Sequence, residues 1–197
     1  GRLQGNILLE GFYTILNDVF TLKKIGIESG IIVNERRNAA GATIGGFTIE
    51  TKLGIPSLFD IQLGYTYQQS RYDEPEQWSD SVTPQREMFR SPDHYGYLSS
   101  NYYITKNFGA SLFATYTGSM LVQHAANTTI DGEEIGDSEV TTPSFLDMGF
   151  KLNYTFQLTD LIRLEINGGI KNIFDAYQND IDKGAGRDSA YVYGPSL

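Results

Sequence analysis

The chain has 197 residues, a formal net charge of −9, no cysteine and an aromatic content of 13%. It contains no apolar run of about 18 residues, which excludes a helical membrane protein. Without cysteine, neither a disulfide framework nor thiolate chemistry is available. Binding to duplex nucleic acid requires clustered Lys and Arg, so we expect no nucleic-acid partner for this acidic chain.

Alternation of apolar and polar residues with a period of two runs through most of the chain and predicts β-strands. Residues 17–41, between the first two strands, form a polar excursion with a small hairpin around 19–22 and 31–35. The predicted strands, in chain order, are 6–16, 42–54, 58–71, 94–104, 108–118, 145–158 and 162–174.

The last two predicted strands show the alternation most clearly. The even positions from Leu146 to Leu158 are all apolar, and those from Ile162 to Ile170 are apolar apart from Gly168. In the paired strands an even-numbered residue must therefore face another even-numbered residue, so that all the apolar side chains lie on one face. A three-residue loop that pairs Leu158 with Ile162 satisfies this condition. Each arm has about 13 residues, enough for a tilted bilayer span of about 9–11 residues.

Loop lengths separate by the edge of the predicted sheet. The turns near residues 56, 106 and 160 are short, whereas the connections near 29, 82, 131 and 182 are long. Outer-membrane barrels distribute their periplasmic turns and extracellular loops in this way. Residues 191–197 are interpreted as the start of one more strand. We therefore expect an all-β fold, an antiparallel up-and-down meander that is part of a transmembrane β-barrel, with about seven full strands and the start of an eighth.

Charge separates by the same edge. The four long loops, 17–41, 72–93, 119–144 and 175–190, together carry 18 acidic and 8 basic residues. The net negative charge of the chain therefore belongs to one rim of the predicted sheet. A solvated acidic surface is the simplest explanation. The alternative is a rim that attracts cations or discourages anions.

A resemblance to a known family rests on segments that span nearly the whole chain in order. The stretch 168–175, Gly-Gly-Ile-Lys-Asn-Ile-Phe-Asp, resembles the motif in the penultimate strand of TonB-dependent outer-membrane receptors. Other segments resemble the Bacteroidetes type of this family: Gly11-Phe12-Tyr13-Thr14, Glu35-Arg36-Arg37-Asn38, Gln69-Ser70-Arg71-Tyr72-Asp73 followed by Gln77-Trp78, Ser91-Pro92-Asp93-His94-Tyr95-Gly96-Tyr97, Thr115-Tyr116-Thr117-Gly118-Ser119-Met120 and Tyr193-Gly194-Pro195.

The resemblance implies that residues 1–197 are the C-terminal segment of such a receptor barrel, with the plug domain and the terminal strand absent. It implies a parent protein in the bacterial outer membrane, in contact with lipid. That parent would import a scarce nutrient, such as a ferric siderophore, haem, cobalamin or a glycan, with energy from the TonB complex. TonB would act through the missing N-terminal part. Because no signal peptide precedes the first strand, we expect a longer precursor.

The alternative is a self-sufficient β-barrel or curved sheet that binds an apolar ligand or serves as an adhesin-like structural protein. The two differ in whether the apolar face of the strands meets lipid outside the barrel or lines its interior. The sequence contains no Ser/His/Asp spacing, no nucleophilic cysteine and no nucleotide-binding glycine motif. We therefore expect neither an enzyme nor a cofactor.

Three side chains are candidates for contact with a ligand. His124 lies where the barrel meets an external loop, and Tyr72 and Trp78 flank another loop, where each could stack on a ligand. The alternatives are a loop-packing histidine and aromatic girdle residues at the membrane interface. A further set of charged residues is expected to line the lumen: Lys151, Arg163, Glu165 and Lys171.

Five acidic residues between positions 119 and 144 could supply oxygen ligands to a calcium-like cation: Asp131, Glu133, Glu134, Asp137 and Glu139. Their spacing does not reproduce an EF-hand, so no metal site is predicted.

An isolated segment of a barrel would have two open edges and an apolar face. Open edges are templates for strand pairing, and large apolar patches promote association. We therefore expect the isolated chain to self-associate, or to curl until its edges meet.

Overall fold

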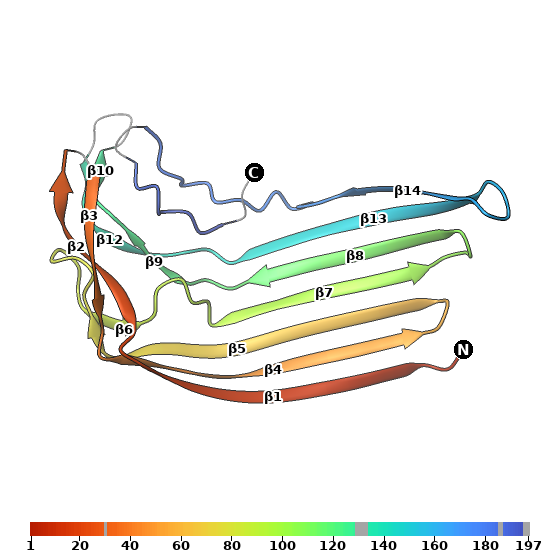
Figure 1. Ribbon diagram of the computed structural model, residues 1–197, viewed down its shortest axis with the longest axis horizontal. Coiled ribbons are helices and arrows are strands. Elements are labelled where there is room, and N and C mark those ends of the chain that lie inside the picture. Colours follow the sequence, from red (N-terminus) through yellow and green to blue (C-terminus); the bar gives the residue numbers. More distant parts are fainter. Residues whose placement is uncertain (30, 129–133, 185–186, 195–197) are drawn as a thin grey trace.

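The computed structural model describes residues 1–29, 31–128, 134–184 and 187–194 and shows a curved antiparallel sheet with a layer of loops at one end (Figure 1). Within these ranges no helix is long and apolar enough to cross a membrane. The long strands are, in their order across the sheet, β1 (Gln4–Asn17), β4 (Gly41–Ile55), β5 (Phe59–Glu76), β7 (His94–Tyr103), β8 (Phe108–Thr117), β13 (Phe145–Gln157) and β14 (Arg163–Ile170).

The predicted meander is confirmed. Every pairing in the main sheet is antiparallel, and each long strand pairs with the next long strand along the chain. Leu158 donates its N–H to the carbonyl of Ile162 at 3.0 Å, so the hairpin has the predicted register. Two strand ends differ from the prediction by more than two residues, because β5 continues to Glu76 and β14 ends at Ile170.

Short turns and long connections lie at opposite ends of the sheet, as the loop lengths predict. The turns around Ser57, Lys106 and Asp160 share the right-hand end in Figure 1, here called the short-turn end. Backbone hydrogen bonds close them, for example from Leu58 N–H to the Ile55 carbonyl at 3.0 Å. The other end is called the long-loop end.

The convex face of the sheet is apolar, and aromatic side chains gather near both of its ends. Near the long-loop end, the Tyr67 ring lies 5.0 Å from His94 and 5.8 Å from Phe47 between centroids. Near the short-turn end, the Tyr154 and Phe156 centroids are 4.5 Å apart. The positions between these aromatic belts are mostly aliphatic: Ile49, Leu63, Leu98, Leu112, Met148, Leu152 and Ile166.

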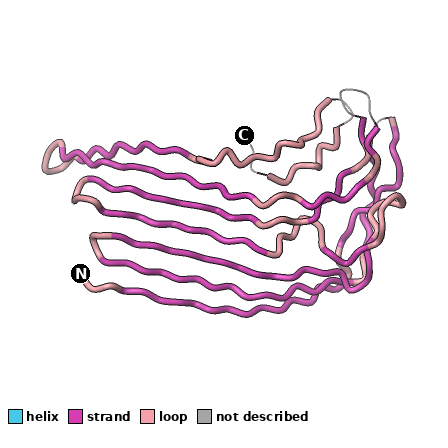
Figure 2. Tube along the Cα trace, turned by 180° about the vertical axis from the view of Figure 1, so that it is seen from behind, coloured by secondary structure: helices cyan, strands magenta, loops and turns pink. Residues whose placement is uncertain are grey.

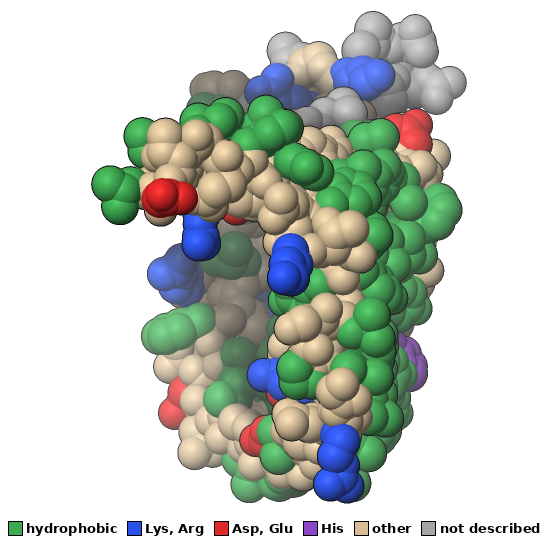
Figure 3. All heavy atoms as spheres, turned by 90° about the vertical axis from the view of Figure 1, so that its right-hand side faces the viewer, with side chains coloured by type: hydrophobic (Ala, Val, Ile, Leu, Met, Phe, Trp, Pro, Cys, Tyr) green, Lys and Arg blue, Asp and Glu red, His purple; other side chains and the backbone are tan. Residues whose placement is uncertain are grey.

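The concave face is polar, and its side chains bond to one another across strands. The Gln62 amide donates to the Tyr97 hydroxyl at 2.7 Å, and this hydroxyl donates to Glu50 at 3.1 Å. Tyr103 donates to Asp60 at 2.9 Å. Figure 3, viewed from the short-turn end, shows hydrophobic side chains outside the curved wall and a hollow inside it. The hollow has a volume of about 1300 Å³ at this end.

The sheet is open, with β1 at one edge and β14 at the other. In the part of the chain that the structure describes, these two strands do not pair with each other. A closed barrel has no free edge, so this sheet is a sector of wall rather than a complete barrel.

The prediction of an eighth strand is wrong for residues 191–194, which form no strand. The Arg90 guanidinium donates to the carbonyl of Ala190 at 2.5 Å and to that of Val192 at 2.8 Å. The Arg90 side chain therefore bonds two backbone carbonyls that a neighbouring strand would bond in a sheet. Residues 195–197 of that prediction lie outside the described ranges.

Short hairpins fill the long-loop end. The predicted small hairpin is confirmed and is longer than expected, with β2 (Phe20–Glu28) paired to β3 (Ile31–Asn38). It stands across the ends of the long strands, which Figure 2 shows from behind. The sequence did not predict the other short strands: β6 (Gln85–Glu87), β9 (Leu121–His124), β10 (Asn127–Thr128), β11 (Glu134–Ile135) and β12 (Ser138–Thr141).

Candidate functional site

The long-loop end brings together four segments that are far apart in sequence. We call the described residues of 18–40, 77–93, 118–144 and 171–194 the loop layer. The three candidate side chains are buried in it or directly below it, with exposed fractions of 8% for Tyr72, 6% for Trp78 and 8% for His124. The girdle alternative for Tyr72 and Trp78 is therefore wrong, since neither is exposed on the convex face.

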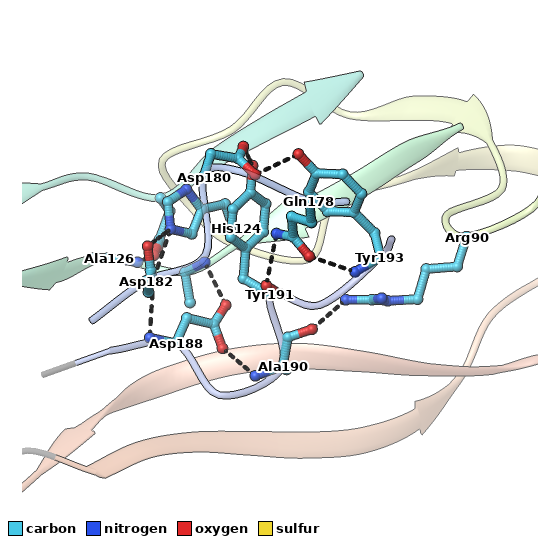
Figure 4. A network of polar contacts seen from close by, with 12 residues as sticks. Arg90, His124, Ala126, Gln178, Asp180, Asp182, Asp188, Ala190, Tyr191 and Tyr193 are labelled. Atoms are coloured by element: carbon cyan, nitrogen blue, oxygen red, sulfur yellow. Dashed lines mark hydrogen bonds and ion pairs between the residues drawn. The ribbon is translucent and has the colours of Figure 1, made fainter. Parts of the chain in front are cut away.

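His124, at the end of β9, is held by the last loop. Its Nε2 lies 2.9 Å from an Asp182 carboxylate oxygen, and its ring stacks on Tyr191 with centroids 3.9 Å apart and an angle of 15°. Asp182 also accepts a hydrogen bond from the N–H of Asp188 at 3.0 Å. These contacts are drawn in Figure 4. His124 therefore fixes the described part of the 175–194 segment to β9 in this structure.

Asp180 organises the end of the same segment. It accepts hydrogen bonds from the hydroxyls of Tyr191 at 2.6 Å and Tyr193 at 2.5 Å (Figure 4). Burial by itself raises the pKa of Asp180, but hydrogen bonds from Tyr191, Tyr193 and Gln178 outweigh it, and the pKa is lowered. Burial and the hydrogen bond to Asp180 raise the pKa of Tyr193 to about 12 and also raise that of Tyr191.

These shifts predict that alkali releases the last loop. Because its pKa rises from 10.0 to about 12 on folding, Tyr193 contributes stability that is fully present below pH 10 and lost as the pH rises through about 12. We expect the difference in tyrosinate absorbance between the wild-type chain and Tyr193→Phe to show a midpoint well above pH 10. A difference midpoint at or below the ordinary tyrosine value would contradict the docked arrangement.

Trp78 lies beneath the β2–β3 hairpin. Its carbonyl accepts the N–H of Lys24 at 2.7 Å, and its indole nitrogen is buried without a hydrogen-bond partner in the described part of the chain. The indole and the Gln85 amide both face the carboxylate of Glu139, although neither reaches hydrogen-bond geometry. Both groups act to lower the pKa of Glu139. Burial, the larger influence, and the charge of Glu87 leave the pKa of Glu139 raised.

Asp137 connects three parts of the loop layer. Its carboxylate accepts hydrogen bonds from Lys24 Nζ at 2.5 Å, from the Ser79 hydroxyl at 2.5 Å and from the Ala126 N–H at 2.6 Å. Burial by itself raises its pKa, but these bonds and the Lys24 charge lower it overall. Asp137 is therefore held as a carboxylate.

The acidic residues considered as cation ligands do not form one group in the structure. Asp137 is engaged by Lys24, and Glu139 faces Trp78. Asp131 and Glu133 lie outside the described residues, as does the side chain of Glu134. Across the described ranges, no cluster of three or more His, Asp or Glu side chains could hold a metal ion.

Two of the four residues expected in the lumen lie around one hollow of the concave face. Lys151 and Glu165 border a space of about 290 Å³ on the short-turn side. Arg163 donates to the Gln157 amide oxygen at 2.9 Å. Lys171 follows the end of β14 and lies near the long-loop end. The structure therefore spreads these charges along the strands rather than gathering them into one site.

The Asn172-Ile173-Phe174-Asp175 motif ends β14 with a tight turn. Asn172 adopts a positive φ of 49°, its N–H donates to Asp147 at 3.2 Å, and its side-chain oxygen accepts the Ala176 N–H at 2.9 Å. Asparagine tolerates this conformation better than most residues. The motif therefore directs the chain from the sheet into the loop layer.

Sequence reasoning missed most residues that build the loop layer. Its key contacts join Lys24 to Asp137, Arg90 to Val192, and His124 to Asp182. The sequence singled out His124 as a ligand candidate, Asp137 as an oxygen ligand and Val192 as part of a strand, but it did not pair any of them with these partners. No local signal in the sequence therefore identifies the contacts.

Comparisons with known proteins agree with this geometry. No family model matches the chain, and no curated protein matches it. Among solved structures, it matches the ferric-catecholate import receptor Fiu from E. coli K12 in its closed form, with a TM-score of 0.58 and 19% identity over 93% of this chain and 23% of Fiu. It also matches the siderophore receptor PiuA from Acinetobacter baumannii, with a TM-score of 0.51 and 15% identity over 83% of this chain and 21% of PiuA.

The chain thus spans less than a quarter of the length of either receptor. Both are TonB-dependent receptors of the outer membrane, and both are transport proteins rather than enzymes. At identities this low, the structural likeness establishes the fold alone. The chain accordingly has the fold of a sector of a TonB-dependent receptor barrel.

Proposed function

We propose that this chain is the C-terminal part of the barrel of a TonB-dependent receptor, of the Bacteroidetes type, in the bacterial outer membrane. The whole receptor imports a scarce nutrient and catalyses no reaction. The cargo belongs to one of four classes: ferric siderophores, haem, cobalamin or glycans. Ferric siderophores are the first to test, because the structural neighbours are a ferric-catecholate import receptor and a siderophore receptor.

The observation that carries this proposal is the division between the two faces of the sheet. The convex face is apolar with an aromatic belt near each end, and large side chains such as Leu63 and Phe150 are 44% and 36% exposed on it. Apolar bands flanked by aromatic girdles are typical of barrel strands in lipid. The polar concave face suits a water-filled or plugged lumen.

The rest of the receptor supplies what this sector lacks. A plug domain would occupy the concave side, where the bonded side chains of Glu50, Asp60 and Tyr97 offer it a polar surface. The TonB complex would act through the N-terminal part. Lys151, Arg163, Glu165 and Lys171 would then line the lumen and contact the plug.

The loop layer would form part of the outer mouth of the receptor. Tyr72, Trp78 and His124 remain our candidates for ligand contact, but all three are buried here. Contact with a ligand therefore requires the loops to rearrange. The acidic loops disfavour a strongly anionic cargo at this part of the rim.

The barrel form of the self-sufficient alternative requires a closed sheet, whereas its curved-sheet form does not. The open edges at β1 and β14 do not support the barrel form.

Growth on a supplied nutrient tests the proposal. The complete reading frame that contains this sequence should let a bacterial strain without siderophore receptors of its own grow on a ferric siderophore when iron is scarce. The same strain without TonB should not grow, because import needs TonB-derived energy. If iron-limited growth is unchanged, haem, cobalamin and glycan uptake are measured in the same way. Uptake of none of the four, or uptake that persists without TonB, would show the proposal to be wrong.

A further inference from the structure

The β2–β3 hairpin, here called the flap, lies across the long-loop end of the sheet (Figures 1 and 2). It leaves the sheet between β1 and β4. Its side chains reach Asp80, beyond the end of β5, and Asp137, in the connection between β8 and β13. Because β5, β7 and β8 follow one another in the sheet, the flap crosses the mouth above all three.

The flap is attached mainly by polar contacts. β2 and β3 pair only with each other among the described strands. Most of their described apolar side chains are exposed rather than packed on the body, with exposed fractions of 72% for Phe20, 61% for Ile25 and 52% for Ile27, whereas Val33 is half-buried. A two-stranded hairpin without a buried apolar face is only marginally stable by itself. Its position therefore depends on polar contacts: the ion pairs of Lys23, Lys24 and Arg37, and the hydrogen bond from the Lys24 N–H to the Trp78 carbonyl.

One of these contacts is buried. Lys24 Nζ lies 2.5 Å from Asp137, and the two side chains are 10% and 6% exposed. Ser79 and the Ala126 N–H fix the same carboxylate from the body of the loop layer. The neighbouring pair, Lys23 with Asp80 at 3.1 Å, is open to water because Asp80 is 85% exposed. Buried pairs lose far more than exposed pairs when one partner is removed.

Both connections of the flap to the sheet depart from strand geometry. Asp18, between β1 and β2, has a positive φ of 52°, and Gly41, at the start of β4, has a φ of 155°. A hydrogen bond from the Ala39 N–H to the Val19 carbonyl, at 2.7 Å, closes the base between them. Hinges are a few residues at element ends that absorb changes in backbone angle.

Buried polar atoms without partners lie beneath and beside the flap. In the part of the chain that the structure describes, they are Arg37 Nε, Trp78 Nε1, Gln85 Nε2 and Glu139 Oε1. Leaving such groups unbonded costs free energy that hydrogen bonds to water or to a ligand would recover. Arg37 belongs to the flap itself and Trp78 lies beneath it, so in the closed position these two groups lack a partner for one nitrogen each.

We propose that the flap is a hinged cover, latched by the Lys24–Asp137 pair, whose opening exposes Trp78 and its polar neighbours to the mouth. The flap turns about the connections at Asp18 and Gly41. The latch holds it closed, and the uncovered groups gain partners when it opens. This motion goes beyond the proposed import function and is defined without any ligand, so its test does not depend on transport.

Trp78 is the only tryptophan of the chain, which makes its fluorescence a direct reporter of the flap. The full chain in detergent micelles is compared with Lys24→Met and with the matched control Lys23→Met, and the quencher is acrylamide. We expect Lys24→Met to raise the quenching constant about threefold or more, because a buried pair is broken. Lys23→Met should leave it unchanged, because its pair is exposed.

Equal quenching of the wild-type chain and Lys24→Met would overturn the latch. Equal increases in both variants would also overturn it, because the effect would then not be specific to the buried pair.

Hydrogen exchange of the wild-type chain provides a test that needs no variant. Peptides from 20–38 should exchange at least about tenfold faster than peptides from 59–70, since only the flap opens locally. Protection of the flap as strong as that of β5 would show that it is a rigid part of the fold.

Discussion

Replacing Phe150 with arginine is expected to lower the free energy of unfolding in lipid by roughly 2–4 kcal/mol. Phe150 lies in the middle of β13 on the convex face, where it pairs with Leu112 on one side and Ile170 on the other. In the proposed receptor this position is near the bilayer midplane. A guanidinium there would lose its hydration without gaining a partner.

Two further arginine variants test depth and sidedness. Tyr154→Arg, in the aromatic belt at the short-turn end, should cost roughly 0–1 kcal/mol, because the side chain can reach the lipid headgroups. Asn153→Arg, on the concave face, should also be mild, since that face meets water or a plug. Urea-induced unfolding in lipid vesicles measures the change in the free energy of unfolding for all three variants. Equal costs at Phe150 and Asn153 would mean that both faces of the sheet are buried.

The isolated chain is expected to associate in buffer without detergent. Its convex face exposes large apolar side chains on every long strand, and such a patch exceeds the few hundred Å² of ordinary monomers. Covering apolar surface gains about 25 cal/mol per Å², which outweighs the loss of a few rim contacts. The edges at β1 and β14 add free backbone groups that can pair with another copy. Sedimentation velocity in detergent-free buffer should therefore show dimers or larger species.

Matched lysine variants identify the surface that associates. Leu9→Lys and Ile166→Lys, on the convex faces of the two edge strands, should shift the distribution toward the monomer. Glu165→Lys, on the concave face of β14, should not. Among the described strands the two edges, β1 and β14, are not joined, so closure by curling is not the arrangement observed. A stable open-edged monomer at micromolar concentration would show that the apolar face does not drive association.

Local pattern was enough to determine the long strands. A period of two assigns each side chain to one of two faces, and a three-residue turn fixes the register of its hairpin. Leu158 therefore pairs with Ile162, and Ile7, Phe47 and Leu112 all fall on the convex face. The segregation of short turns from long loops follows from the same spacing. These features depend only on residues close together in the chain.

Depth along the strands was not determined in this way. Tyr154 and Phe150 are both even-numbered residues of one strand, so the alternation places them on the same face. It does not show which of them lies near the middle of the wall. The pairing of Tyr154 with Phe108, directly after a turn, places it near the short-turn end. Only the register across neighbouring strands supplies this information.

The loop layer was decided by tertiary structure. Lys24 and Asp137 are 113 residues apart, and Arg90 and Val192 are 102 apart. Such pairs follow no period, because the sheet beneath them sets which loops become neighbours. Residues 191–194 illustrate the same cause, since their alternation of Tyr and Val suits a strand, but Arg90 and Asp180 bond them as a loop. The sequence by itself thus determined the wall and its two faces, whereas the tertiary structure decided which polar groups meet at the mouth.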